Sequence, residues 1–235
     1  MSKHIEYKPN NKYYSRYNQT WINATMRLIN FTISSKISTE NPKIIDIGCG
    51  RGELLKNLSE KHYQCFGVDF DEECVELCKQ YGNIICGNAT EIDQLFEENY
   101  FDLVIMMHAL EHTLDPTEVI RNLKFVTKKY LIIAVPNLSS TSTFWHGIRR
   151  KEPVFVNRGH RFGWDSSHLK TFLESSCDLN IIKWEPDRVV IPSKVALFFK
   201  FFGMLEWLEL KVLPRFFPLL SNSLIVLCEK RNVTD

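Results

Sequence analysis

The sequence predicts an α/β protein with a mostly parallel sheet and helices on both faces of that sheet. Short apolar runs rich in β-branched residues recur along the chain, as expected of strands buried on both faces. Segments with the apolar spacing of a helix separate these runs. The first run, at 43–47, leads into a loop that contains Gly48, Gly50 and Gly52, and a helical pattern begins at Glu53. A strand, a glycine loop and a helix in this order bring a ligand against bare backbone at a helix N-terminus.

The spacing of the glycines separates two kinds of nucleotide-binding loop. A dinucleotide fingerprint reads G-x-G-x-x-G, and its third glycine would fall on Glu53. Here Asp46 is followed by glycines at alternate positions, with Cys49 between the first two. This pattern resembles the glycine loop of class I S-adenosylmethionine-dependent methyltransferases. Because turns need glycine for steric reasons alone, the interpretation depends on the rest of the chain.

Length and composition suit one α/β domain with an appendage. The chain has 235 residues, 44% hydrophobic and 24% charged, with a formal net charge of +1. Such a charge provides no overall electrostatic attraction to nucleic acid or to a membrane, and nucleic acid is not an expected partner. Seven cysteines without a C-x-x-C pair fit a reducing compartment, and the polar N-terminus shows no signal peptide. We therefore expect a cytoplasmic protein. No metal site is expected, because Cys74 and Cys78 share a helical face but have no other ligands nearby.

The next two predicted strands end in residues that suit a nucleoside. Residues 64–69 end in Asp69, 23 residues after Asp46, where an acidic residue meets a ribose in such folds. A carboxylate there accepts hydrogen bonds from both ribose hydroxyls, although a solvated turn aspartate is the alternative. A third strand at 84–86 precedes Asn88 and Ala89. The family usually has Asp at the position of Asn88, where it accepts from the adenine amino group, and an amide oxygen keeps that capacity.

Two histidines follow the fourth predicted strand, at 101–107. His108 and His112 fall at its carboxyl end, the edge at which open α/β sheets bind ligands. The string FDLVIMMHALEH resembles the corresponding segment of the ubiquinone-type O-methyltransferases. A helix capped by Asp115 and a fifth strand at 131–135 follow, and the strand ends in Pro136-Asn137 as in that group.

The resemblance runs from Asp46 to Asn137 without interruption. It implies a three-layer, Rossmann-like fold whose seven-stranded sheet has its last two strands at 180–184 and 223–228. It also implies S-adenosyl-L-methionine as the cofactor and a methyltransferase domain at 41–235, with a capping segment at 1–40 and insertions at 138–164 and 185–222. The implied cofactor-binding residues are Asp46, Gly48, Cys49, Gly50, Gly52, Asp69, Phe70, Asn88, Ala89 and His108.

The two insertions lie outside the shared core and are expected to determine the acceptor. The first is basic, and Arg149, Arg150 and His160 are its candidate substrate-binding residues, suited to a phosphate or carboxylate. A solvated charged face is the alternative. In the second insertion, Ser193 is expected to cap one helix that continues to Leu213. Its apolar surface fits, in order of preference, a lid or homodimer contact, an apolar acceptor pocket, or a peripheral membrane contact.

The predicted reaction is transfer of the sulfonium methyl to a small-molecule, lipid-linked or glycan acceptor, by O-methylation. A hydroxyl acceptor needs a base, and His112 and His108 are the candidates, with His160 third. A carboxylate acceptor would need no base. Two other functions remain open: a catalytically silent S-adenosylmethionine-binding regulator, which would keep the same loop, and an NAD-dependent dehydrogenase, which the glycine spacing disfavours.

Overall fold

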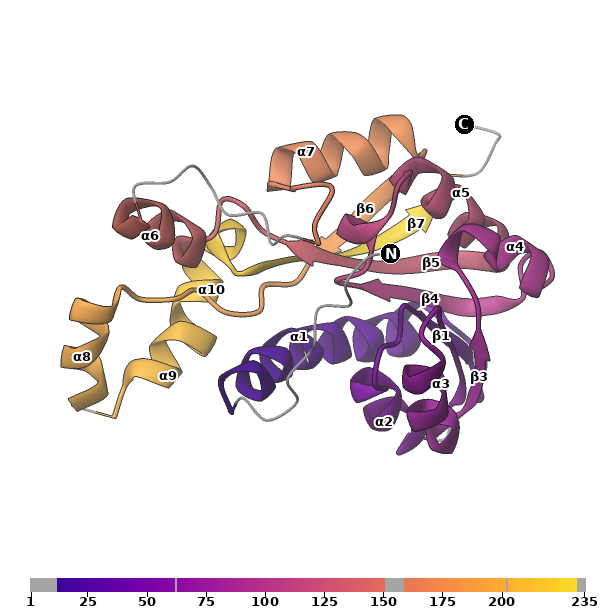
Figure 1. Ribbon diagram of the computed structural model, residues 1–235, viewed down its shortest axis with the longest axis horizontal. Helices are drawn as coiled ribbons and strands as arrows, with labels where there is room; N and C mark the ends of the chain where they lie inside the picture. The colour runs from indigo at the N-terminus through magenta and orange to yellow at the C-terminus, as the bar shows by residue number, and fades with distance from the viewer. Residues whose placement is uncertain (1–11, 62, 151–158, 202, 232–235) are drawn as a thin grey trace.

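One seven-stranded sheet forms the centre of the fold (Figure 1). The computed structural model describes residues 12–61, 63–150, 159–201 and 203–231 of the chain. The sheet has the order β3-β2-β1-β4-β5-β7-β6, and β7 alone is antiparallel to its neighbours. The predicted seven-stranded, mostly parallel sheet is thus confirmed. The strands are β1 (Lys43–Ile47), β2 (Gln64–Asp69), β3 (Asn83–Cys86), β4 (Phe101–Met107), β5 (Thr127–Pro136), β6 (Leu179–Trp184) and β7 (Ser223–Lys230).

Helices cover both faces of the sheet, which confirms the predicted three layers (Figure 1). One face packs on α1, α2 and α3, and the other on α4, α5 and α7. Within β1, for example, Ile44 belongs to the first core and Ile45 to the second, since successive side chains of a strand point to opposite faces. The helices are α1 (Lys12–Lys36), α2 (Glu53–Ser59), α3 (Glu72–Cys78), α4 (Ile92–Leu95), α5 (Pro116–Val126), α6 (Thr141–Arg150), α7 (Ser166–Thr171), α8 (Ser193–Phe201), α9 (Leu205–Trp207) and α10 (Leu213–Phe216).

Local signals in the sequence set where three of these helices begin. Asp71, Asp115 and Asp165 each accept hydrogen bonds from backbone N–H groups in the first turn of α3, α5 and α7. Such a side chain satisfies donors that a helix start leaves without partners. Pro116 follows as the first residue of α5, where a missing N–H has no cost.

The prediction of one helix from Ser193 to Leu213 is wrong. The chain leaves the helix after α8, and Gly203 has a φ of +68°, which a right-handed helix does not admit. Pro214 lies inside α10 instead of ending a longer helix. Short helices α8, α9 and α10 therefore gather with α6 beyond the carboxyl ends of β4 and β5 (Figure 1). No helix in the described part of the chain is long and apolar enough to cross a membrane.

Candidate functional site

The four strands β1 to β4 run parallel, so the loops that follow them meet at one edge of the sheet. The glycine loop follows β1, Asp69 ends β2, Asn88 follows β3 and His108 follows β4. These are the segments that the sequence predicted to hold a ligand, and the parallel topology brings them to one edge.

The glycine loop turns sharply because its backbone adopts left-handed conformations. The φ angles of Gly48 and Gly50 are +75° and +52°. A Cβ on Gly48 would lie 2.7 Å from Cβ of Ala109, whereas a Cβ on Gly50 would meet nothing within 4 Å. Gly52 lies inside the fold instead, where a Cβ would approach Sγ of Cys78 to 2.8 Å. The backbone at Gly50 therefore faces open space, which suits close approach of a ligand.

Asp69 links this loop to the end of β2. Its Oδ2 accepts from the backbone N–H of Gly50 at 2.7 Å, and its Oδ1 accepts from Asp71 at 3.0 Å. Each carboxylate oxygen keeps a second lone pair that a hydroxyl donor can use. Asp46 is buried below the loop, and burial together with the charge of Asp69 raises the pKa of its carboxyl to about 7. Its Oδ1 has no hydrogen-bond partner among the described residues.

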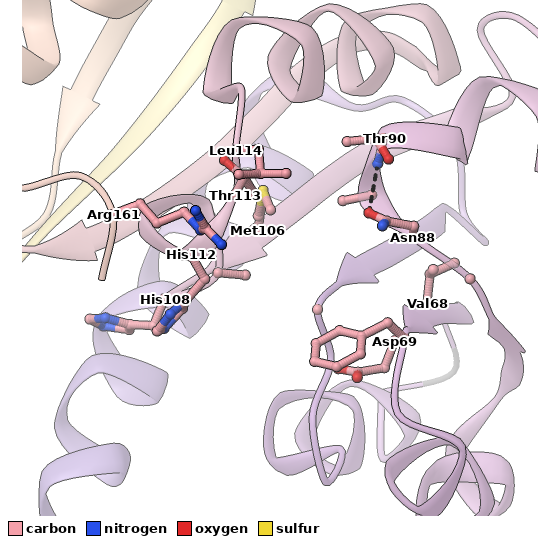
Figure 2. A pocket seen from close by; sticks show the side chains of 15 residues that line it. Val68, Asp69, Asn88, Thr90, Met106, His108, His112, Thr113, Leu114 and Arg161 are labelled. Carbon is pink, nitrogen blue, oxygen red and sulfur yellow. Dashed lines mark hydrogen bonds between the residues drawn. The ribbon is translucent and has the colours of Figure 1, made fainter. Parts of the chain in front are cut away.

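A cavity of about 490 Å³ lies at this edge of the sheet (Figure 2). Its polar groups fall at two ends, with Asp69 and Asn88 on one side and His108, His112 and Arg161 on the other (Figure 2). Oδ1 of Asn88 already accepts from the N–H of Thr90 at 3.1 Å, which fixes the orientation of the amide. The predicted site residues in the wall are Gly48, Asp69, Phe70, Asn88, Ala89, His108 and His112.

The other predicted residues lie elsewhere or outside the description. Asp46, Cys49, Gly50 and Gly52 do not line the cavity, and burial raises the pKa of the Cys49 thiol above its usual range. The side chains of Arg149 and Arg150 lie outside the described residues. The sequence assigned no site role to Val68, Gly87, Thr90, Met106, Ala109, Thr113, Leu114 and Arg161, which complete the wall. In the sequence, Arg161 could be recognised only as one of the cations in the basic insertion at 138–164.

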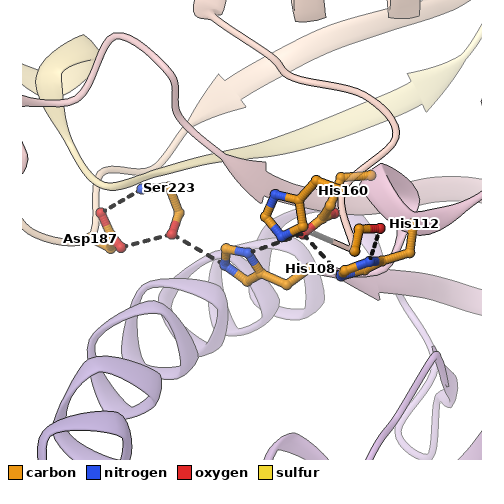
Figure 3. A network of polar contacts seen from close by, with 7 residues as sticks. His108, His112, His160, Asp187 and Ser223 are labelled. Atoms are coloured by element: carbon orange, nitrogen blue, oxygen red, sulfur yellow. Dashed lines mark hydrogen bonds and ion pairs between the residues drawn. The ribbon is translucent and has the colours of Figure 1, made fainter. Parts of the chain in front are cut away.

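A buried carboxylate lies among three imidazoles beside this cavity (Figure 3). Oε1 of Glu111 is 3.7 Å from Nδ1 of His108 and 4.0 Å from Nε2 of both His112 and His160. The Glu111 side chain is 1% exposed, and its Oε2 has no hydrogen-bond partner in the described chain. Sequence reasoning missed Glu111, although a charged residue between two histidines at a strand end was a usable signal.

The contacts of His112 fix which of its ring nitrogens is basic. Nδ1 lies 2.9 Å from the backbone oxygen of Gly159, which accepts hydrogen bonds and does not donate them. Nδ1 therefore carries the hydrogen, and in the neutral ring Nε2 keeps its lone pair. The His160 ring packs edge-on against His112, with centroids 4.8 Å apart. Burial lowers the pKa of His160, and the nearby Glu111 carboxylate opposes that change.

The same cluster has a donor set that can hold a metal ion. One ligand atom each from Glu111, His112 and His160 lies within 4.8 Å of the others. Ligand atoms that share one transition metal at ~2.0–2.2 Å stand ~3–3.5 Å apart, so a metal would require a small contraction. The sequence did not reveal this group because His160 is distant along the chain. The expectation that no metal is used stays a prediction.

Comparisons with known proteins place these features in context. The family model described as a methyltransferase domain matches residues 13–176. The ubiquinone biosynthesis O-methyltransferase of Nitrosospira multiformis is 29% identical over 84 residues, covering 33% of this chain and 35% of that protein. That of Stutzerimonas stutzeri is 33% identical over 98 residues, or 38% of this chain and 41% of that protein. The chain thus spans less than half the length of these curated relatives.

Solved structures share the fold at low sequence identity. A SAM-dependent methyltransferase from Archaeoglobus fulgidus matches 94% of this chain and 100% of its own, with a TM-score of 0.58 and 20% identity. The magnesium protoporphyrin IX methyltransferase of Synechocystis PCC 6803, solved with bound SAH, matches 94% of this chain and 88% of its own, with a TM-score of 0.64 and 14% identity. At these identities the likeness concerns the fold alone.

Proposed function

The chain belongs to the methyltransferase-domain family, and from that premise we propose that it binds S-adenosylmethionine and methylates a hydroxyl group of an acceptor. One observation supports this function above the others. The cavity has a carboxylate and an amide that suit a nucleoside at one end, Asp69 and Asn88, and the imidazoles of His108 and His112 at the other (Figure 2). A methyl donor bound at the first end would direct its reactive group toward the second.

The residues at the first end fit the cofactor. Asp69 would accept from the ribose hydroxyls, Asn88 would face the adenine, and the exposed ring of Phe70 would cover an apolar face of the base. The open space above Gly50 admits a ligand against the backbone. When bound, S-adenosylmethionine supplies a methyl group on a positively charged sulfur, an excellent leaving group. The protein therefore has to align the acceptor and accept its proton.

His112 is the proposed base. Its Nδ1–H is held by the carbonyl of Gly159, so Nε2 is free to take a proton from an acceptor hydroxyl. The imidazolium that forms would lie 4.0 Å from the Glu111 carboxylate, whose charge stabilises it. A carboxylate acceptor would need no such step. His108 is the second candidate, because it also lines the cavity.

We propose an acceptor with an anionic group, a small molecule or the head of a lipid-linked or glycan molecule. Arg161 lies in the cavity wall on the histidine side, where a guanidinium can bind a carboxylate or phosphate through two hydrogen bonds (Figure 2). Arg149 and Arg150 belong to the same basic stretch of the sequence and are further candidates for binding this group. The insertions that carry α6 and α8 to α10 would cover the acceptor, and a homodimer or a peripheral membrane contact would use their exposed apolar side chains. The proposed location is the cytoplasm.

Calorimetry and product analysis test this function. S-adenosylhomocysteine should bind the purified protein more tightly than NAD, and tighter binding of NAD would favour a dehydrogenase. A labelled methyl donor should then transfer label to members of a panel of phenols, quinols, carboxylates and sugars. Binding of S-adenosylhomocysteine without transfer to any acceptor in a cell extract would favour a silent regulator.

A further inference from the structure

A chain of hydrogen bonds joins His108 to a buried carboxylate in the segment that follows β6 (Figure 3). Nε2 of His108 lies 3.2 Å from Oγ of Ser223, the first residue of β7. Oγ of Ser223 in turn donates to Oδ2 of Asp187 at 2.9 Å. The Asp187 side chain lies in the segment between β6 and α8 and is 3% exposed. His108 is thus connected to a group that does not touch the cavity.

The backbone around Asp187 determines the direction of these hydrogen bonds. Its Oδ1 accepts from two backbone N–H groups, those of Arg188 at 2.6 Å and Ser223 at 3.1 Å. The carboxylate therefore receives three donors, and the hydrogen of the Ser223 hydroxyl points to Oδ2. Because that hydroxyl has one hydrogen, its oxygen has only lone pairs to offer to His108. When the Asp187 carboxyl is ionised, Nε2 of His108 is therefore the protonated nitrogen.

Several contacts hold these three residues in place. The N–H of Asn222 bonds the carbonyl of Arg188 at 2.9 Å, which fixes the Asp187 segment against the start of β7. His108 has a φ of +50°, which is uncommon for a residue with a side chain. Its own N–H bonds the carbonyl of Ala134 on β5, and its ring lies 5.1 Å from that of Trp21. Such an enforced conformation is typical of positions where a side chain must be aimed.

We propose that Ser223 and Asp187 are positioning residues that hold His108 in the tautomer protonated at Nε2, which leaves Nδ1, the nitrogen facing Glu111, as its basic atom. This inference rests on the proposed function, in which His108 is a candidate base. A fixed tautomer matters because a histidine can accept a proton only at its unprotonated nitrogen. With Nε2 of His108 bonded to Ser223, the basic nitrogens are Nδ1 of His108 and Nε2 of His112. A proton taken up at either atom would lie beside the Glu111 carboxylate, whose charge would stabilise it.

An Asp187→Asn substitution provides a sharp test because it should reverse the whole chain. The two backbone N–H groups that bind Oδ1 require an oxygen there, so the amide nitrogen takes the position of Oδ2. That nitrogen donates to Oγ of Ser223, whose hydrogen then turns to Nε2 of His108. The tautomer should change to the one protonated at Nδ1. Ser223→Ala removes the link and should give a mixture of both tautomers, whereas Ser223→Thr keeps the hydroxyl and should retain the wild-type tautomer.

Nuclear magnetic resonance of ¹⁵N-histidine-labelled full-length protein reads the tautomer directly. Spectra would be recorded at a pH of about 8.5, well above the ordinary histidine pKa of ~6.5, with His108→Gln to assign the signals. We expect hydrogen at Nε2 in the wild type and in Ser223→Thr, and at Nδ1 in Asp187→Asn. Hydrogen at Nδ1 or at both nitrogens in the wild type would overturn the proposal. An unchanged tautomer in a folded Asp187→Asn protein would do the same.

A titration of the same samples with S-adenosylhomocysteine separates this inference from the proposed function. The Ser223 and Asp187 variants should bind the ligand as the wild type does, because neither residue lines the cavity. Absence of binding in every sample would contradict the cofactor assignment, while the tautomer results would still decide the role of Ser223 and Asp187. Near-ultraviolet circular dichroism identifies variants that have not folded. Because Ser223→Ala and Asp187→Asn alter different residues, the test can still be made with one of them if the other does not fold.

Discussion

Gly50 donates its backbone N–H to Oδ2 of Asp69 across 2.7 Å, so the glycine loop and the end of β2 form one unit. Asp69 therefore has two roles in the proposed site. Its carboxylate would accept from the ribose, and it also holds the loop against which the ligand lies. Substitutions must separate these roles.

Asp69→Ala should weaken binding of S-adenosylhomocysteine by at least tenfold. Each lost charge-assisted hydrogen bond is worth roughly 1.5–3 kcal/mol, and about 1.4 kcal/mol corresponds to a factor of ten. Asp71→Ala is the matched control, because Asp71 caps α3 two residues away and does not line the cavity. The control should lose about 1 kcal/mol of stability and keep its affinity. Calorimetry decides, and an unchanged affinity in Asp69→Ala would remove this residue from the site.

Gly50→Ala and Gly48→Ala should differ in what they damage. A left-handed alanine costs ~1–2 kcal/mol at either position. At Gly48 the new Cβ also overlaps Ala109, so that variant should lose more unfolding free energy in urea. At Gly50 the Cβ enters open space, so the main effect should be weaker binding of S-adenosylhomocysteine. Equal affinity of Gly50→Ala and wild type would show that no ligand approaches this backbone.

The elevated pKa of Asp46 predicts how stability depends on pH. Because burial raises this pKa from 3.8 to about 7, the folded state binds a proton more tightly than the unfolded state. This contribution is therefore present at low pH and is lost as the pH rises from about 4 to 7. One pKa unit is about 1.4 kcal/mol, so the loss amounts to at most ~4 kcal/mol. Urea titrations of Asp46→Asn should lack this decline, and parallel pH profiles for the two proteins would contradict the assignment.

The sequence predicted the parts of this molecule that depend on local chemistry. Asp71 and Asp115 cap helices, and a cap needs only one side-chain acceptor and the next few backbone N–H groups of the chain. The glycine loop likewise depends on a few neighbouring residues. The break at Gly203 was missed because glycine is tolerated inside apolar helical patterns. The contacts of Glu111 with His160, and of His108 with Ser223, join residues that are distant in the chain. Only the strand order β5-β7-β6 brings Ser223 beside β5 and within reach of His108, and no periodicity records that order.

Arg161→Ala should raise the KM for an anionic acceptor and leave the affinity for S-adenosylhomocysteine unchanged. Removing one guanidinium–carboxylate contact costs roughly 1.5–3 kcal/mol, a factor of ten or more. Arg121→Ala is the control, because that arginine pairs with Glu118 on the surface of α5. The double variant Arg149→Ala, Arg150→Ala tests the rest of the basic stretch. If Arg161→Ala and the double variant both keep the wild-type kinetic constants, the basic stretch is only a solvated face.

His112→Gln should lower turnover at saturating substrates by roughly 10²–10⁴-fold, the usual contribution of a positioned base. Its Nδ1–H is fixed by Gly159, so Nε2 is the basic atom that the substitution removes from a side chain in the cavity wall. Binding of S-adenosylhomocysteine should stay intact, because no cofactor contact is assigned to this ring. His168→Gln is the matched control, since His168 is 78% exposed and pairs with Asp165 at the start of α7.

A packing role for His112 predicts a different result from the same preparations. The ring lies edge-on against His160 and bonds the backbone at Gly159, so its loss also removes contacts between the turn after β4 and the segment at 159–161. If these contacts are its whole contribution, His112→Gln should lower the melting temperature while the folded fraction turns over at the wild-type rate. If His112 is the base, turnover falls even at temperatures where the variant is fully folded. Measuring the melting curve and kcat on one sample separates the two, and a destabilised but fully active variant would assign the proton transfer to another residue.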